Sequence, residues 1–384
     1  MKRRIGILTA GGDCPGLNAA IRGVARASYN MFDAEFVGIR DGYKGLIKGE
    51  YKEMTQSDFS GILTLGGTIL GTSRQPYRTM RKIEEDKVDK VAAMKANYKK
   101  MKLDCLITLG GNGTHKTANL LAEEGLNVIG LPKTIDNDIW GTDVTFGFHT
   151  AVDIATEVID RIHTTANSHG RVLIVEIMGN KAGWLTLFSG VAGGADVILL
   201  PEIPYNLNSV LEAVEGRAKK QKRRFSIIAV AEGAMTTKEA GMKGKERNAL
   251  RAKEPYMSVS YRVADQISKE TGFECRVVVP GHFQRGGSPS PYDRILATRL
   301  ASRPLASSGR SIMAWLSLRL GISSPRIPSR KWPAKASWSL RIIRWSTSPA
   351  PWASSSATNK AFRYLRSPGS KPGDFLFSRI SLPL

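Results

Sequence analysis

The sequence predicts an α/β protein with mainly parallel sheets. Seven short apolar runs recur within the first 300 of its 384 residues, and each run is continuous, as in strands buried on both faces. Helical patterns separate the runs: in residues 149–163 apolar side chains recur every three or four positions. Strands that alternate with helices form parallel sheets with right-handed crossovers, and functional loops then follow the carboxyl ends of the strands.

The apolar runs give the expected strands in chain order. They are residues 4–9, 105–109, 127–131, 172–178, 197–200, 225–230 and 276–279. Helices are predicted over residues 149–163 and over residues 18–29, an alanine-rich segment that opens after Pro15 and Gly16. The length predicts two domains. No apolar run is long enough to cross a bilayer, so no membrane partner is expected.

Positive charge is concentrated in the last part of the sequence. The formal net charge is +22, and residues 301–384 hold 14 Lys or Arg but a single acidic residue, Asp374. The same segment holds 19 serines, 9 of the 18 prolines and 5 of the 7 tryptophans, without helical or strand periodicity. So many tryptophans are unusual for a disordered tail. Our hypothesis is an out-of-frame translation that begins near Leu300, and the alternative is a basic disordered tail.

The charge also suggests a nucleic-acid-binding protein. Because the excess charge lies in an unpatterned segment, it predicts only salt-sensitive binding without sequence preference, and no specific nucleic-acid partner. The three cysteines, Cys14, Cys105 and Cys275, are too few for a disulfide framework. We therefore expect a protein of the reducing cytoplasm.

Two glycine-rich loops follow predicted strands, at residues 9–18 and 109–114. Glycine allows the backbone to approach an anion closely, and the N-terminus of a helix favours negative charge. A third turn, residues 71–74, ends in Arg74, whose planar cation suits phosphate oxygens. Together they predict a phosphate site. The alternative for each loop alone is a tight turn without a ligand.

A cluster of acidic and amide residues follows the strand predicted at residues 127–131. It reads Pro-Lys-Thr-Ile-Asp-Asn-Asp from residue 132 to residue 138. Asp136 and Asp138, two positions apart on an extended loop, can face the same side. One carboxylate can then take a proton from a hydroxyl while the other orients it or binds a metal ion. The alternative is a turn stabilised by Asp and Asn side chains.

A basic loop follows the last predicted strand. His282, Gln284 and Arg285 lie in a segment with three glycines, and Arg276 lies in the strand before it. This composition suits a fixed dianion such as a sugar phosphate. The alternative for His282 is a hydrogen-bonded core histidine. The sequence contains no zinc-ligand spacing and no nucleophile-elbow serine motif.

These motifs resemble the phosphofructokinase family. The segments GGDCPGLNAAIRG, GGNGT, PKTIDND, MGNKAGW and GHFQRGGSPSPYDRILATR follow one another in the family order, from Lys2 to about Arg299. The resemblance implies two similar three-layer domains. Residues 1–147 plus 283–300 would bind the phosphoryl donor, and residues 148–282 would bind fructose 6-phosphate. It further implies transfer of a phosphoryl group to the 1-hydroxyl of that sugar, with Mg²⁺, in a homotetramer or homodimer with shared sites.

The resemblance also implies roles for single residues. Asp136 would accept the proton of the sugar hydroxyl, Asp138 would assist, and Thr134 would contact the transferred group. Arg171, with Arg276, matches arginines that reach into a neighbouring subunit's site. The donor-binding residues would be Gly12, Arg74, Gly111, Asn112, Gly113 and Thr114. The substrate-binding residues would be Thr134, Asp136, Arg171, Met178, Gly179, Asn180, Glu232, Arg276, His282 and Arg285.

Three departures from the family pattern concern the donor. Asn112 stands where the family often has a magnesium-binding Asp, so metal affinity falls or moves to Asp136 and Asp138. Gly113 stands where pyrophosphate-using relatives usually carry Asp, and the space left for the α-phosphate of a nucleotide favours ATP. Lys133 replaces a glycine of typical bacterial ATP-using members. The sequence thus predicts an ATP-dependent 6-phosphofructokinase. The alternatives are a pyrophosphate-dependent enzyme and a catalytically weak sugar-phosphate-binding protein.

Other departures concern substrate and regulation. Asn180 replaces an arginine of typical bacterial members, and the adjacent Lys181 can supply a cation but no bidentate fork. Arg22 and Arg26 match arginines that bind effectors in regulated relatives, but they also suit a solvated helix face. His163 stands where those relatives have another effector arginine. We therefore do not expect an intact effector site.

Overall fold

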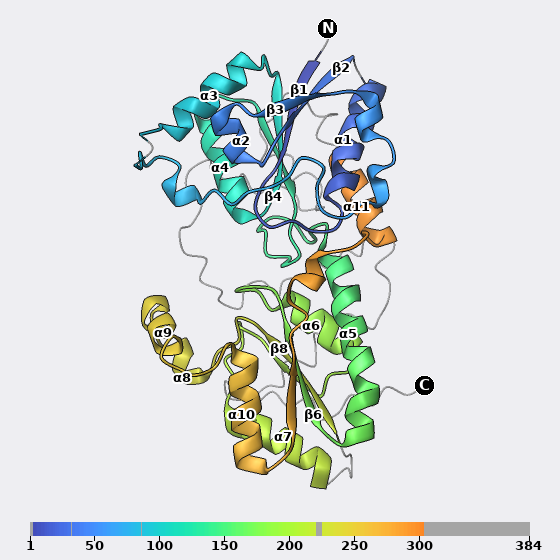
Figure 1. Cartoon of the computed structure of the whole chain (residues 1–384), viewed down its shortest axis with the longest axis vertical. Helices are drawn as coiled ribbons and strands as arrows, with labels where there is room; N and C mark the ends of the chain where they lie inside the picture. The colour runs from blue at the N-terminus through green and yellow to red at the C-terminus, as the bar shows by residue number, and fades with distance from the viewer. Residues whose placement is uncertain (1–2, 32, 86, 220–224, 303–384) are drawn as a thin grey trace, which may run out of the picture. The chain divides into compact units, whose positions relative to one another are not determined.

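The computed structural model describes residues 3–31, 33–85, 87–219 and 225–302, which fall into two compact units (Figure 1). Unit 1 comprises residues 3–154 and 282–302, and unit 2 comprises residues 155–281. The predicted α/β class with mainly parallel sheets is confirmed. The predicted assignment of donor and sugar to separate domains stays a prediction. The hypothesis of an out-of-frame tail concerns residues outside the described part.

Unit 1 is built on a five-stranded sheet in the order β3-β2-β1-β4-β5. Three strands were predicted: β1 (Arg3–Thr9), β4 (Cys105–Gly110) and β5 (Val128–Pro132). They are parallel, as is β2 (Ala34–Ile39), whereas β3 (Tyr51–Met54) is an antiparallel edge strand. The apolar runs are nearly continuous because helices cover both faces of the sheet.

The helices of unit 1 lie on both sides of its sheet (Figure 1). Helix α1 (Leu17–Met31) packs against α11 (Pro291–Ser302) on one side. On the other side lie α2 (Tyr43–Lys48), α3 (Lys90–Lys100) and α4 (Asn112–Glu123). Short 3₁₀ turns at Gln56–Phe59, Ile62–Thr64 and Tyr77–Thr79 connect β3 to α3. The two helix layers and the sheet give the three-layer arrangement that was expected.

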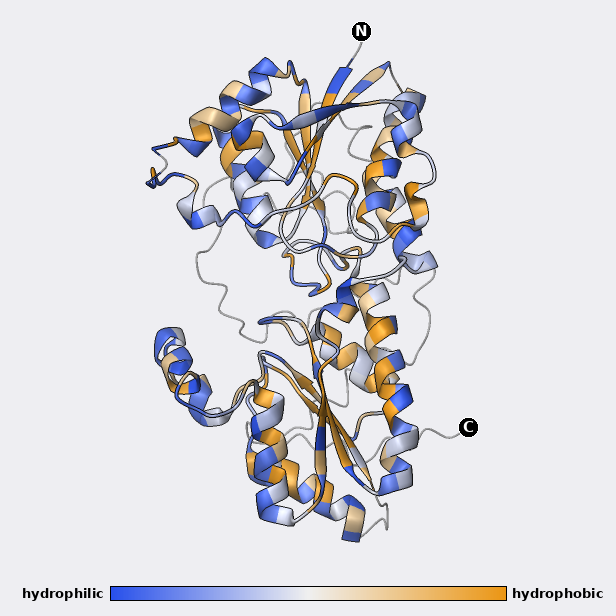
Figure 2. Ribbon diagram, viewed as in Figure 1, coloured by the Kyte–Doolittle hydropathy of each residue, from blue (hydrophilic) through white to orange (hydrophobic). Residues whose placement is uncertain are grey.

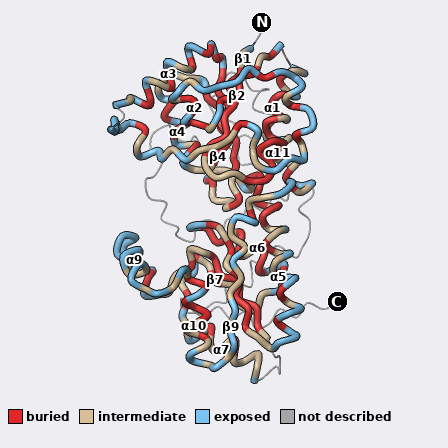
Figure 3. Tube along the Cα trace, viewed as in Figure 1, coloured by how far each residue is buried: buried red, intermediate tan, exposed pale blue. Residues whose placement is uncertain are grey.

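Unit 2 is built on a wholly parallel sheet in the order β7-β8-β6-β9. Its strands, β6 (Val172–Ile177), β7 (Val197–Leu199), β8 (Ser226–Ala231) and β9 (Cys275–Val278), were all predicted. Helices α5 (Phe148–His169) and α6 (Trp184–Ala192) lie on one side, with α7 (Leu207–Lys219) and α10 (Val259–Thr271) on the other (Figure 1). The central strands β6 and β8 form the hydrophobic, buried centre of the unit, whereas β7 and β9 are mostly half-buried (Figures 2 and 3).

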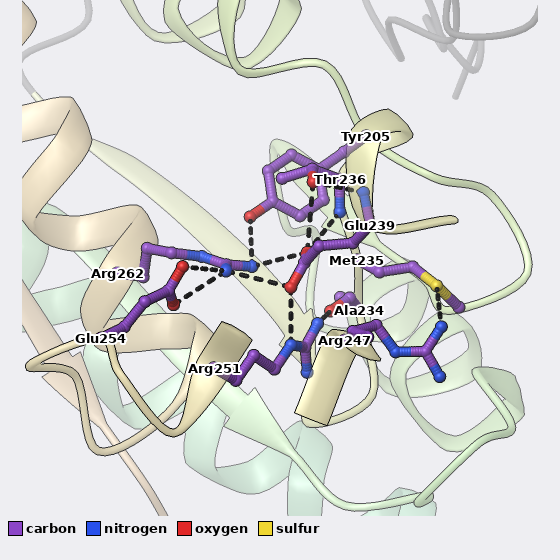
Figure 4. A network of polar contacts seen from close by, with 9 residues as sticks. All are labelled: Tyr205, Ala234, Met235, Thr236, Glu239, Arg247, Arg251, Glu254 and Arg262. Carbon is purple, nitrogen blue, oxygen red and sulfur yellow. Dashed lines mark hydrogen bonds and ion pairs between the residues drawn. The ribbon is translucent and has the colours of Figure 1, made fainter. Parts of the chain in front are cut away.

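Two short helices of unit 2, α8 (Thr237–Ala240) and α9 (Gly244–Arg251), lie apart from its sheet (Figure 1). Helix α9 has no buried residue, and a charged network around the buried Glu239 holds its end (Figure 4). The carboxylate of Glu239 accepts hydrogen bonds from Arg251 Nε (2.6 Å) and Arg262 Nη2 (2.8 Å). Burial raises the pKa of Glu239, but these bonds outweigh it and hold that pKa at about 2.

Within the described residues, no helix combines the length and the apolar character needed to cross a membrane.

Candidate active site

Two of the predicted phosphate loops are joined at the carboxyl edge of the unit 1 sheet. Gly11, just after β1, donates its backbone N–H to the carbonyl of Ser73 (3.0 Å), and Thr72 donates its hydroxyl to the carbonyl of Gly11 (2.7 Å). Arg74 is exposed at the end of this turn. The structure thus brings residues 71–74 beside the first glycine loop, although some sixty residues separate them in the sequence.

The second glycine loop joins the same edge. Gly111 precedes the first turn of α4, where the amides of Asn112, Gly113 and Thr114 have no intrahelical acceptor. Thr114 donates its hydroxyl to the carbonyl of Ala10 (3.3 Å), which ties this loop to the first. Free amides at a helix N-terminus bind anions. The two loops therefore form one candidate anion site, as their glycines predicted.

The acidic loop after β5 is fixed by its asparagine. Asn137 adopts a left-handed conformation (φ 51°), and its Oδ1 accepts a hydrogen bond from the backbone N–H of Thr145 (2.9 Å). Thr145 also donates its hydroxyl to the carbonyl of Thr134 (2.7 Å). The turn that the alternative interpretation expected is thus present, but Asn137 supplies it. Asp136 and Asp138, both partly exposed, are not needed for that turn.

Asn112 contacts Asp138 directly. The amide nitrogen of Asn112 donates to Oδ2 of Asp138 (2.9 Å) and to its backbone carbonyl (3.1 Å). Burial raises the pKa of Asp138, against the effect of this hydrogen bond. An aspartate at position 112 would place a second carboxylate within hydrogen-bond distance of Asp138. A bound cation would then be needed to offset the repulsion between the two charges. Here a neutral donor orients the carboxylate.

Two cationic side chains contact the backbone of the first glycine loop. Lys133 is buried, and its Nζ donates to the carbonyl of Gly12; burial lowers the pKa of this lysine. Arg285 Nη1 donates to the carbonyl of Asp13 (3.2 Å), and a Cβ at Gly12 would overlap the same nitrogen. A side chain at position 12 would therefore force the guanidinium of Arg285 to move away from the loop.

The position of Lys133 is a contact that the sequence interpretation missed. The sequence placed Lys133 among the donor-selecting residues but not among the residues that build the site. The sequence did carry a signal for this contact, because Lys133 directly follows a buried strand and precedes the acidic loop.

The glycine at position 113 leaves open space, because a Cβ there would meet no atom within 4 Å. The space that was expected above Gly113 is therefore open.

In unit 2, residues 178–180 and Glu232 follow neighbouring strands of the sheet. Glu232 Oε1 accepts hydrogen bonds from the backbone N–H of Gly179 (3.1 Å) and of Asn180. Both residues have positive φ values, 144° and 52°, which only Gly and Asn adopt readily. Met178 is half-buried and Asn180 is exposed. Glu232 thus holds the loop that carries three of the predicted substrate residues.

Arg171 and Arg276 lie at the opposite edge of the same sheet. Arg171 directly precedes β6, and Arg276 pairs with Leu173 near the amino ends of the parallel strands β6 and β9. Both arginines form ion pairs with Glu274, at 2.9 Å for Arg171 Nε. Within one copy of unit 2 they are therefore separated from residues 178–180 by the length of the strands.

The remaining predicted residues lie on the surface or serve the fold. His282 is exposed in the 3₁₀ turn Gly281–Arg285. His163 Nε2 lies 2.8 Å from the carbonyl of Gly193, which gives this ring a structural partner. Arg26 is exposed, and Arg22 lines a shallow hollow of about 300 Å³ on α1 and α11. The absence of an intact effector site stays a prediction.

The described residues contain no group of three or more His, Cys, Asp or Glu side chains that could hold a metal ion alone. Mg²⁺, however, usually takes only one or two carboxylates from a protein and the rest of its ligands from substrate phosphates and water. Oxygens of Asn112, Asp136 and Asp138 beside an anion site fit that pattern. The residues present therefore suit an ion that arrives with a phosphate ligand.

Comparisons with known proteins agree with the geometry. A family model described as Phosphofructokinase matches residues 4–306. An ATP-dependent 6-phosphofructokinase of Spirochaeta thermophila is 57% identical over 303 residues, which are 78% of this chain and 82% of that protein. A pyrophosphate–fructose 6-phosphate 1-phosphotransferase of Amycolatopsis mediterranei is 48% identical over 303 residues, 77% of this chain and 84% of that protein.

A solved structure gives the same result for the fold. Phosphofructokinase from Saccharomyces cerevisiae superposes with a TM-score of 0.68 at 30% identity and covers 85% of this chain. The match spans 43% of the yeast chain, so this chain corresponds to less than half of that larger subunit.

Proposed function

Because the chain belongs to the phosphofructokinase family, we propose that it transfers the γ-phosphoryl group of ATP to the 1-hydroxyl of fructose 6-phosphate. The product is fructose 1,6-bisphosphate, and the reaction belongs to glycolysis. One observation carries the proposal: three phosphate loops and the acidic loop meet at one sheet edge of unit 1, joined by hydrogen bonds. The free cysteines Cys14, Cys105 and Cys275 suit the reducing cytoplasm.

The donor would lie against the two glycine loops. Amides of the first turn of α4, with Gly12 and Arg74, would hold its phosphates, and Lys133 supports the loop from behind. Phosphoryl transfer needs positioning and charge stabilisation more than covalent chemistry. Preorganised backbone donors supply both without rearrangement during the reaction.

Asp136 would accept the proton of the sugar hydroxyl. Its backbone N–H is fixed by Thr134 Oγ1 (3.1 Å), and Asn137 holds the loop around it. Asp138, oriented by Asn112, would assist, and oxygens of these residues would hold the magnesium ion of the donor. When bound, that ion neutralises phosphate charge.

The sugar phosphate would be held by the residues that the family resemblance implies. Met178, Gly179 and Glu232 would contact the sugar, and His282 and Arg285 would hold the 6-phosphate. Arg171 and Arg276 lie at the far edge of the unit 2 sheet, which supports a site that another copy completes. We therefore propose a homodimer or homotetramer with shared sites.

Pyrophosphate is the second candidate donor, because the relative from Amycolatopsis mediterranei uses it according to its name. The open space at Gly113 favours ATP, since a nucleotide needs room beyond its β-phosphate. The test measures fructose 1,6-bisphosphate formation from fructose 6-phosphate and Mg²⁺, with ATP and pyrophosphate in parallel. We expect turnover with ATP. Turnover with pyrophosphate alone would overturn the assignment of ATP as the donor. Binding of fructose 6-phosphate without turnover would indicate a sugar-phosphate-binding protein.

A further inference from the structure

A buried contact joins two helices of unit 1 outside the loops described above. Asp293, the third residue of α11, is fully buried. Its Oδ2 accepts hydrogen bonds from the backbone N–H (2.7 Å) and the hydroxyl (2.6 Å) of Thr150, the third residue of α5. A carboxylate at this place satisfies a first-turn amide and favours the helix dipole. Asp293 therefore caps a helix other than its own.

Ser290 completes the contact. Its backbone N–H donates to Thr150 Oγ1 (3.0 Å), and its hydroxyl accepts a hydrogen bond from the N–H of Asp293 (3.3 Å). The hydroxyls of Ser290 and Thr150 lie 3.2 Å apart. We call Thr150, Ser290 and Asp293 the clasp. It fastens the residue before α11 to the first turn of α5.

Helix stability alone does not account for a carboxylate in the clasp. Asp293 Oδ1 is buried and has no hydrogen-bond partner among the described residues. A buried carboxylate with an unsatisfied oxygen costs stability, and apolar residues at such places often give more. Buried polar groups of this kind can instead select one arrangement of the chain.

The clasp bounds the segment that carries two of the predicted phosphate-binding residues. Between His282 and Ser290 the chain is held on the clasp side by Arg294 Nε, which donates to the carbonyl of Pro289 (2.7 Å). Ser288 donates its hydroxyl to the carbonyl of Thr64 (2.7 Å). At the other side Arg285 donates to the carbonyl of Asp13, and Gln284 beside it is buried. The clasp therefore fixes the carboxyl end of the segment.

We propose that Asp293 is a positioning residue for binding of the 6-phosphate: through Thr150 and Ser290 it fixes the segment that carries His282 and Arg285. This inference rests on the proposed function, in which those two residues hold the 6-phosphate. Asp293 contacts neither substrate nor reacting atoms. Its loss therefore weakens the sugar phosphate complex through misplacement, and leaves the donor loops and the acidic loop unchanged.

The test compares Asp293→Ala with Asp89→Ala. Asp89 caps α3 in the same unit by accepting a hydrogen bond from Ala92 (2.9 Å), and it lies far from the segment in sequence. We expect Asp293→Ala to raise the KM for fructose 6-phosphate by at least about tenfold, with kcat and the KM for ATP within about threefold. Asp89→Ala lowers the melting temperature without changing either KM.

A conservative variant separates positioning from packing. Asp293→Asn keeps an oxygen that can accept from Thr150, so the KM for fructose 6-phosphate returns to within about threefold of the wild-type value. Thr150→Val keeps the shape but removes the hydroxyl that donates to Asp293 and accepts from Ser290, and it gives an intermediate KM because the backbone N–H of Thr150 still binds Asp293. Should Asp293→Ala fail to fold, Thr150→Val decides: an unchanged KM overturns the proposal.

Hydrogen exchange gives a readout that does not depend on activity. Backbone amides of residues 281–290 should exchange at least about tenfold faster in Asp293→Ala, and at the wild-type rate in Asp89→Ala. A wild-type protein without turnover would refute the proposed function, while faster exchange would still support the clasp. An active wild type, with unchanged KM and exchange in Asp293→Ala, would refute the clasp alone.

Discussion

The two units hold their loops by different means. In unit 1 neutral and cationic side chains join the site loops, as Thr72 and Thr114 do, beside the backbone contact between Gly11 and Ser73. In unit 2 carboxylates hold the loops: Glu232 accepts from the amide of Gly179 (3.1 Å), and Glu202 accepts from the amide of Gly183 (2.7 Å). One substitution at Glu232 would therefore remove the support of its loop, whereas each loop of unit 1 has several contacts.

This difference separates the two halves of the proposed reaction. Unit 1 supplies donors that are fixed before any ligand binds, which suits the transfer of charge between oxygens. Unit 2 supplies a loop that depends on Glu232, while its two predicted substrate arginines lie at the opposite edge of the sheet, where we propose that they serve another copy. We therefore expect substitutions in unit 1 to act on kcat, and those in unit 2 to act on sugar binding and assembly.

The largest expected effect is that of Asp136→Asn. Loss of the proposed base should lower kcat by about 10³-fold, because general base catalysis contributes roughly 10²–10⁴. The affinity for ATP, measured by calorimetry, should stay within about twofold. Asp33→Asn, on the surface of the same unit, is the control and should leave kcat unchanged. An Asp136→Asn enzyme with a tenth of the wild-type kcat would contradict the assignment.

Arg171→Ala tests whether copies share a site. We expect the variant alone to lose about 10²-fold in kcat/KM, since a desolvated cation on a phosphate is worth a few kcal/mol. Mixed with Asp136→Asn under conditions that exchange subunits, it should regain activity at least about tenfold above either variant, because some sites then contain both intact residues. No recovery in verified hybrids would show that each copy uses its own arginine.

Gly113→Asp tests the open space in unit 1. A Cβ at Gly113 meets no atom within 4 Å, so the fold should tolerate the change. The new charge would repel the α-phosphate of ATP, and kcat/KM for ATP should fall by about 10²-fold. Gly113→Asn, of nearly the same size, is the neutral control, and its kcat/KM for ATP should fall less. Equal losses for both variants would show that space, not charge, selects the donor.

Glu232→Ala tests the carboxylate support of unit 2. Without Oε1 as an acceptor, residues 179 and 180 are free to leave their left-handed conformations, and the KM for fructose 6-phosphate should rise by about tenfold. Glu232→Gln keeps an accepting oxygen and should restore most of the affinity. If Gln were as harmful as Ala, the charge of Glu232 in its proposed sugar contact would matter more than its support of the loop.

Local apolar patterns predicted seven of the nine strands in the described part of the chain. Seven strands were correct because each is a continuous apolar run. Strand β3 was missed because only Met54 of its four residues is buried, so an edge strand left no apolar pattern. Strand β2 is buried but was also missed, although its run from Ala34 to Ile39 is apolar except for Glu35.

The same limit applies to the candidate site. The glycine and acidic loops were predicted because they follow strands and their residue types suit phosphate binding and proton transfer. The contacts of Lys133 with Gly12 and of Asn112 with Asp138 join segments 121 and 26 residues apart, and no local pattern encodes such distances. The clasp around Asp293 was likewise invisible, since Ser290 and Thr150 are ordinary residues until the fold brings them together.

The smallest expected effect on catalysis is that of Glu239→Gln, which tests the stability of unit 2. The folded-state pKa of Glu239, about 2, lies below its usual value of 4.5. Such a group stabilises the fold above pH 4.5, and this contribution is lost as the pH falls towards 2. The unfolding free energy of the wild type should therefore exceed that of Glu239→Gln at pH 7, and the difference should shrink below pH 4.5. Activity at pH 7 should be unchanged, because the network contains none of the proposed substrate residues (Figure 4). A difference that stays constant from pH 7 to pH 2 would show that the network stabilises unit 2 through packing rather than charge.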